Sequence, residues 1–170
     1  MCIRDRTSAR ASRNALHAYS ILRTLDLDEA RDGVARVFSP HELKVASAER
    51  RLDTRMCHAS LGAVSINRLR YGATVDIDVG RTNDFLLVMM PLHGVSEVRC
   101  GDDSIRSTPK LASVISPTLP PRMRSRYAAD PILVPIVRGL VEGTCIQYLG
   151  HGTSRRENSQ PGRDLNNSGG

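Results

Sequence analysis

After about residue 43, the spacing of apolar residues changes from the period of a helix to the period of a strand. Three segments then alternate apolar and polar residues, namely 54–60, 62–71 and 73–79. The pair Val64 and Ile66 illustrates the alternation, and a glycine punctuates each segment. Because the side chains of a strand point to opposite faces in turn, this pattern predicts strands with one face buried.

Further short strands are expected along the rest of the chain. The continuously apolar segment 84–92 is bounded by turn residues, which predicts a strand buried on both faces. A hairpin is expected from 95–99 and 104–107. The other expected strands are 110–116, 122–127 and 132–137. Eight or so short strands in close succession favour a mainly β fold, a barrel or sandwich of the jelly-roll kind.

A helix is expected on each side of this β-rich block. Asp26 and Glu29 have the spacing of a capping box, and apolar residues recur on one helical face over 26–38, before Ser39-Pro40 ends the pattern. A second helix is expected over 139–150, although each of the two glycines inside it costs about 1 kcal/mol.

These boundaries divide the chain into four parts. Residues 1–23 are polar and arginine-rich and are expected to form a disordered leader, whose start, Met1-Cys2-Ile3-Arg4-Asp5-Arg6, resembles the translation of a sequencing adaptor. Residues 24–138 are expected to form the barrel with its opening helix, and 139–150 the C-terminal helix. Residues 151–170 are rich in Ser, Asn and Gly and are expected to form a disordered tail.

The positive charge lies mostly outside the predicted barrel. Of the net charge of +6, residues 1–23 carry +4 and residues 151–170 carry +1, which leaves +1 for residues 24–150. A nearly neutral body is not a phosphate-binding surface. With 4% aromatic residues and no Trp, the chain also lacks the side chains that stack on single-stranded nucleic acid.

The cysteines and the apolar segments exclude further classes of protein. Cys2, Cys57, Cys100 and Cys145 form no C-x-x-C pair, so neither a zinc knuckle nor a redox motif is indicated, and free thiols in a reducing compartment are expected. No apolar segment approaches the roughly 18 residues of a membrane span. We therefore expect a soluble, cytoplasmic protein that does not contact a membrane.

Several short motifs follow one another in a characteristic order over about residues 21–150. They are Thr24-Leu25-Asp26-Leu27-Asp28-Glu29-Ala30, Pro40-His41-Glu42-Leu43, Leu69-Arg70-Tyr71-Gly72, Asp84-Phe85-Leu86-Leu87, Pro91-Leu92-His93-Gly94 and Ile115-Ser116-Pro117. In this order and spacing, they resemble the AraC-binding-like sensor domain of AraC-type bacterial transcriptional regulators.

The resemblance implies a cupin-like barrel that binds a small-molecule effector. It also implies that residues 139–150 are the remnant of a dimerisation helix and that the intact parent is a homodimer. In that family a DNA-binding module of two helix-turn-helix units follows, and residues 151–170 cannot supply it. The chain is thus expected to be a sensor domain truncated before that module and able to contact DNA only through it.

An enzyme on the same fold is the main alternative. A metal-dependent cupin needs two His residues at i and i+2 on one strand, whereas the sequence offers only His93 and Glu97 across a turn glycine. No G-x-S-x-G motif is present, and Cys57 and His58 would point to opposite faces of a strand. We expect no catalytic residue, no metal and no cofactor. A stand-alone cupin-like small-molecule-binding protein, a degenerate metal-dependent cupin enzyme and a truncated relic remain open alternatives.

Five residues are candidates for contact with an effector. Arg68 and Arg70 share one strand face and could meet an anionic effector, or they are solvated if that face points outward. Met89 could adapt to a ligand or simply belong to the core. Tyr71 has the opposite parity to the arginines, and His93 is expected near the mouth of the barrel. These types suit an organic acid or an aromatic compound as effector.

Overall fold

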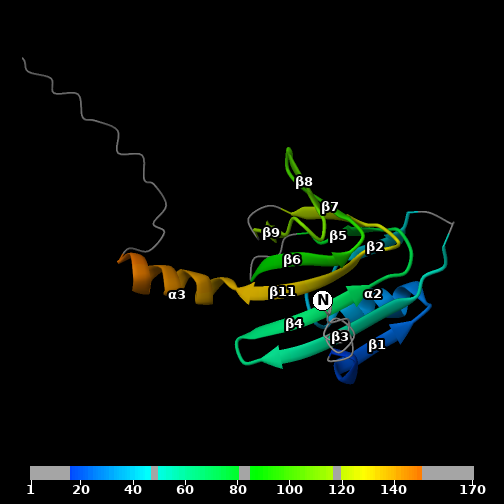
Figure 1. The fold of residues 1–170 in the computed structure, drawn as a ribbon, viewed down its shortest axis with the longest axis horizontal. Helices are drawn as coiled ribbons and strands as arrows, with labels where there is room; N and C mark the ends of the chain where they lie inside the picture. The colour runs from blue at the N-terminus through cyan, green and yellow to red at the C-terminus, as the bar shows by residue number, and fades with distance from the viewer. Residues whose placement is uncertain (1–15, 47–49, 81–84, 117–119, 151–170) are drawn as a thin grey trace, which may run out of the picture.

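The structure, a computed structural model, describes residues 16–46, 50–80, 85–116 and 120–150. The expectations for the adaptor-like residues 1–6 and for the tail 151–170 lie outside the described residues. Within the described part, two antiparallel sheets face each other, and helix α3 (Arg138–Leu149) extends away from them (Figure 1). This arrangement confirms the mainly β, jelly-roll fold that the alternating segments predict.

Each sheet is built from strands that are distant in the sequence. The first has the order β1-β3-β4-β11-β6-β9 and the second the order β2-β5-β10-β7-β8. The strands of the first sheet are β1 (Ser20–Thr24), β3 (Thr54–Leu61), β4 (Val64–Arg70), β11 (Asp130–Val137), β6 (Phe85–His93) and β9 (Ser113–Ile115). Those of the second sheet are β2 (Glu42–Val45), β5 (Val75–Asp78), β10 (Pro121–Ser125), β7 (Ser96–Cys100) and β8 (Asp103–Ser107).

The core lies between the two sheets. Every second residue of the central strands points inward, because neighbouring side chains of a strand leave on opposite faces. The first sheet contributes Met56, Leu69, Leu87 and Leu133, and the second contributes Val75 and Val98, all buried. The period-two pattern of the sequence is therefore the pattern of this core.

Helix α2 (Leu27–Ala35) is capped at its N-terminus by Asp26, as its sequence predicts. The side chain of Asp26 accepts a hydrogen bond from the Glu29 backbone N–H at 2.9 Å. The Glu29 carboxylate does not complete the expected box directly. It accepts instead from the Thr24 hydroxyl at 2.6 Å, and the same hydroxyl accepts from the Asp26 N–H at 3.0 Å. The helix ends at Ala35, three residues earlier than the predicted end at 38.

The expectation of a disordered leader up to residue 23 is wrong for residues 16–23. Leu16–Tyr19 form a short 3-10 helix, η1, and β1 pairs with β3 along its length. The apolar residues of this segment do not alternate regularly with polar ones, so its sequence predicts no strand. Its backbone groups pair with the edge of β3, and its Leu22 side chain packs against the core from one face, so pairing rather than hydropathy fixes it.

The expectation that 84–92 is buried on both faces is also wrong. Leu87 and Met89 are buried in β6, but Met90 and Leu92 are 38% and 42% exposed. In a two-sheet sandwich only the inner face of a sheet packs against the other sheet. The continuous apolar run therefore places one set of apolar side chains on the outer surface.

Helix α3 follows β11 directly and ends where the sequence predicts. Gly150 adopts the left-handed conformation with φ 70°, and its N–H donates to the Ile146 carbonyl. None of the residues of α3 is buried. Neither described helix is long and apolar enough to cross a membrane.

Candidate ligand-binding site

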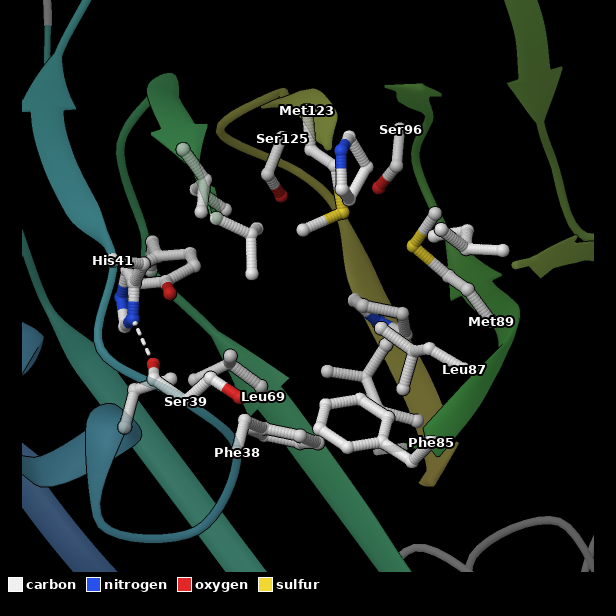
Figure 2. Close-up of a pocket in the computed structure, with 18 residues that line it drawn as sticks. Phe38, Ser39, His41, Leu69, Phe85, Leu87, Met89, Ser96, Met123 and Ser125 are labelled. Carbon is white, nitrogen blue, oxygen red and sulfur yellow. Dashed lines mark hydrogen bonds between the residues drawn. The ribbon is translucent and has the colours of Figure 1, made fainter. Parts of the chain in front are cut away.

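A cavity opens between the two sheets at the centre of the core (Figure 2). Its volume is ≈ 70 Å³, counted as the room for the centre of a water molecule. Strands β4, β6 and β11 supply one wall, β5, β10 and β7 supply the other, and the segment between α2 and β2 closes one side. Since a single buried water needs roughly 10–15 Å³ by the same measure, a small organic molecule fits here.

The walls of the cavity are almost entirely apolar. Phe38 and Phe85 approach each other with ring centroids 6.5 Å apart and planes tilted by 49°. Leu87 and Met89 of β6 and Met123 of β10 face the same space (Figure 2). Aromatic rings and flexible thioethers adapt to flat apolar ligands, and thioethers make favourable contacts with aromatic rings.

His41 brings one polar atom to this apolar wall. Its Nδ1 lies 2.9 Å from the Ser39 carbonyl oxygen, which can only accept, so Nδ1 carries the proton and donates. The other ring nitrogen, Nε2, is buried and has no hydrogen-bond partner in the structure. This hydrogen bond therefore leaves Nε2 as a buried, unpaired acceptor beside the cavity.

Two serines place hydroxyls on the opposite wall. Ser96 of β7 and Ser125 of β10 are directly paired across the strands, and both side chains line the cavity (Figure 2). Both residues are buried, with Ser96 only 2% exposed, and the Ser96 hydroxyl has no hydrogen-bond partner. A buried hydroxyl without a partner is uncommon in folded proteins and calls for a physical explanation.

Tyr71 lies at the end of β4 and is 3% exposed. Burial raises the pKa of its phenol well above the ordinary value, so the group stays neutral at physiological pH. Among the described residues that line the cavity, there is no Asp, Glu, Lys or Arg. The site therefore presents apolar surface and neutral hydrogen-bonding groups.

The structure places two of the five candidate residues in the cavity lining and three outside it. Tyr71 and Met89 line the cavity, whereas Arg68, Arg70 and His93 do not. Since Leu69 and Tyr71 point inward, the two arginines between and beside them must point outward. His93, at the far end of β6, is exposed.

Arg68 is neither solvated nor free to meet a ligand. Its guanidinium donates to both carboxylate oxygens of Asp130, with Nε at 2.8 Å and Nη2 at 2.5 Å. The hydrogen bonds that Arg68 donates to this carboxylate are the largest cause that raises the pKa of Arg68. Arg70 is exposed and lies opposite Arg55 of β3, which matches the alternative that it is solvated.

Sequence reasoning missed His41, Ser96 and Ser125 as cavity residues. His41 belongs to one of the quoted motifs, but a single histidine after a helix gives no sign of what it faces. Ser96 shares the parity of the buried Val98, and a polar residue at a buried strand position is the signal that could have found it.

The described residues also show how the candidates for metal binding and catalysis are arranged. Across 16–46, 50–80, 85–116 and 120–150, no group of three or more His, Cys, Asp or Glu side chains could hold a metal ion. Glu97 accepts from Arg126 at 2.8 Å instead of pairing with His93. His58 contacts Asn67 at 2.7 Å, while Cys57 lies opposite the outward-facing Arg68, as the strand parity predicts.

A comparison with known proteins finds a matching family model and a similar regulatory protein. The model of the AraC-binding-like domain matches residues 30–167. A "Probable thc operon regulatory protein" from Rhodococcus erythropolis is 34% identical over 89 residues, which is 52% of this chain and 27% of the relative. The chain thus matches only about a quarter of that protein.

Solved structures similar to this chain are found at low sequence identity. The AraC-like transcriptional activator CuxR superimposes with a TM-score of 0.57 at 15% identity, over 73% of this chain and 49% of that chain. A cupin-2 domain, Rru_A2000 from Rhodospirillum rubrum, gives a TM-score of 0.42 at 12% identity, over 56% of this chain and 69% of that chain. With most of its length matched by the family model, the chain belongs to the AraC-binding-like domain family.

Proposed function

We propose that this chain is the effector-sensing part of an AraC-type transcriptional regulator and that it binds a small molecule in the cavity between its sheets. The observation that carries the proposal is a pair of buried polar atoms without a partner, His41 Nε2 and Ser96 Oγ, in two residues that line an apolar cavity. A few convergent polar groups in an apolar pocket are the usual composition of a small-molecule site.

The energetic cost of these atoms supports the proposal. A buried polar group without a hydrogen bond destabilises a fold by about 1–3 kcal/mol. Replacing Ser96 by an apolar residue would remove that cost, so the fold itself gains nothing from the hydroxyl. A ligand that hydrogen-bonds to Ser96 and His41 removes this cost when it binds. The two polar groups then stabilise the ligand-bound state over the free state, as an effector site requires.

The exposed apolar residues of α3 support homodimerisation in the intact regulator. Four apolar side chains of this helix are largely exposed: Leu140 43%, Ile146 53%, Tyr148 78% and Leu149 61%. These positions are spread around the helix, which packs mainly against β11, and burial of such a helix against a second copy would remove this apolar surface from water. We assign DNA binding to a separate helix-turn-helix module of the longer parent protein.

Ligand binding is tested by thermal unfolding with a library of small metabolites and aromatics. Adjacent methionines offer a matched pair of variants, because Met89 faces the cavity and Met90 faces outward. We expect some compounds to raise the Tm of the wild type and of Met90→Phe but not of Met89→Phe, in which the larger ring occupies the cavity. The proposal fails if no compound raises the Tm, or if the two variants respond alike.

Dimerisation is tested by sedimentation velocity on the chain and two α3 variants. Ile146→Glu places a charge at one of the exposed apolar positions, and Gln147→Glu adds the same charge at the neighbouring polar position. We expect Ile146→Glu to shift the protein to monomer and Gln147→Glu to leave the dimer intact. A monomeric wild type at the highest attainable concentration would remove the dimer from the proposal.

A further inference from the structure

We propose that the effector is an uncharged, mainly apolar molecule with a small flat ring, which carries a hydrogen-bond donor for His41 and an acceptor for the Ser96–Ser125 pair. The inference rests on the proposed function, because it names the class of molecule that the cavity takes. Simple neutral aromatic amides have this combination of groups.

The charge of the lining excludes an ionised effector. Burying an ion without a partner of opposite charge is strongly unfavourable. Arg68 and Arg70, the candidates for pairing with an organic acid, lie outside the cavity, and Arg68 is already paired with Asp130. The described lining residues include no carboxylate either, so they offer a cation no counter-charge.

The direction of hydrogen bonding follows from the neighbours of each polar group. His41 Nδ1 donates to the Ser39 carbonyl, so in the neutral ring Nε2 is an acceptor that suits a donor from the ligand. The Ser96 hydroxyl, beside Ser125, can donate to a ligand acceptor (Figure 2). A ligand with both a donor and an acceptor therefore suits these two groups.

The apolar lining favours a ring over a flexible chain. The Phe85 ring and the thioethers of Met89 and Met123 line the same cavity as His41 and the two serines (Figure 2). A flat ring contacts these side chains without the loss of rotamer freedom that an extended alkyl chain would suffer on binding.

The experiment uses a set of nearly isosteric probes on the 170-residue chain at neutral pH. Benzamide is neutral, benzoate is the matched anion, benzamidinium is the matched cation, and toluene carries no hydrogen-bonding group. Affinities are measured by calorimetry, and the methyl resonances of Met89 and Met90 report whether each probe enters the cavity.

We expect benzamide to bind at least about tenfold more tightly than benzoate and benzamidinium, because each ion would be buried unpaired. Ser96→Ala is expected to weaken benzamide by about 2- to 10-fold and to leave toluene unchanged. Ser60→Ala, on the exposed part of β3, serves as the matched control and is expected to leave both affinities unchanged.

The outcomes separate this inference from the function on which it rests. Benzoate that binds as tightly as benzamide at neutral pH, where benzoate is ionised, would overturn the neutral class, while the sensor function stands. An equal loss of benzamide and toluene in Ser96→Ala would also overturn it. If neither toluene nor benzamide shifts the Met89 methyl, the cavity is not a binding site and the proposed function itself fails.

Discussion

Asp130 and Arg68 form a two-point ion pair across β11 and β4, on the outer face of the six-stranded sheet. The two guanidinium nitrogens lie 2.8 and 2.5 Å from the two carboxylate oxygens. The side chains are only 10% and 23% exposed. A planar pair of this kind fixes both side chains, so Arg68 supports the sheet and does not reach a ligand.

Breaking this pair is expected to destabilise the fold. Asp130→Ala leaves Arg68 partly buried without its partner, and we expect the free energy of unfolding to fall by about 1–3 kcal/mol. Asp76→Ala removes the exposed pair with Arg124 and serves as control, with an expected loss below about 1 kcal/mol. Urea denaturation measures both, and equal losses in the two variants would contradict this role for Asp130.

Asn67 is expected to be the most sensitive polar position of the core. The residue is 0% exposed, and its amide donates to the Leu133 carbonyl at 3.2 Å and to the Ser65 hydroxyl at 3.0 Å. Its carbonyl oxygen lies 2.7 Å from His58 Nδ1. Asn67→Ala should lower the free energy of unfolding by about 2–3 kcal/mol, because buried groups lose their partners. Chemical denaturation checks this, with Ser65→Ala as the milder comparison, and a loss as small as that of Ser65→Ala would contradict it.

Gly94 is expected to tolerate no side chain. Its φ is +68°, and a Cβ there would lie 2.5 Å from the backbone carbonyl carbon of Ala128. Gly80 has a similar φ of +60° but open space around it. We expect Gly80→Ala to cost about 1–2 kcal/mol from backbone conformation alone and Gly94→Ala to cost clearly more, since its clash is with backbone. Thermal unfolding of the two variants measures the difference, and equal losses would show that the Ala128 backbone yields.

Stability is expected to fall in acid. Hydrogen bonds from Arg55, Arg124 and Arg126 lower the pKa values of Asp53, Asp76 and Glu97, respectively. These carboxylates therefore stabilise the fold above their unfolded pKa values of about 4, and the contribution is lost as the pH falls through the lower folded values.

Urea denaturation at neutral and acidic pH tests this dependence. We expect the free energy of unfolding to decrease as the pH falls below about 4 and Asp76→Asn to show a weaker decrease. Because the pairs are on the surface, each contributes below about 1 kcal/mol. Ser60→Ala should keep the wild-type dependence, and an Asp76→Asn variant that does the same would rule out this carboxylate as a source.

The sequence predicted the element types well because they depend on local patterns. The alternation at Val75 and Ile77 is set by the geometry of a strand, and the Asp26 cap by hydrogen bonds within one turn. Strand β1 escaped prediction, since its place depends on pairing with β3, more than thirty residues away along the chain.

The sequence alone determined that Arg68 and Arg70 share a face and that Tyr71 lies on the other, because side chains alternate along any strand. Only the tertiary structure decided which face meets the cavity, since that depends on which sheet packs against it. It also brought His41 from the segment after α2 opposite Ser96 of β7 (Figure 2). The packing of the two sheets brings polar residues from distant segments to the same cavity. No local pattern in the sequence predicts this arrangement, because it depends on how the sheets pack.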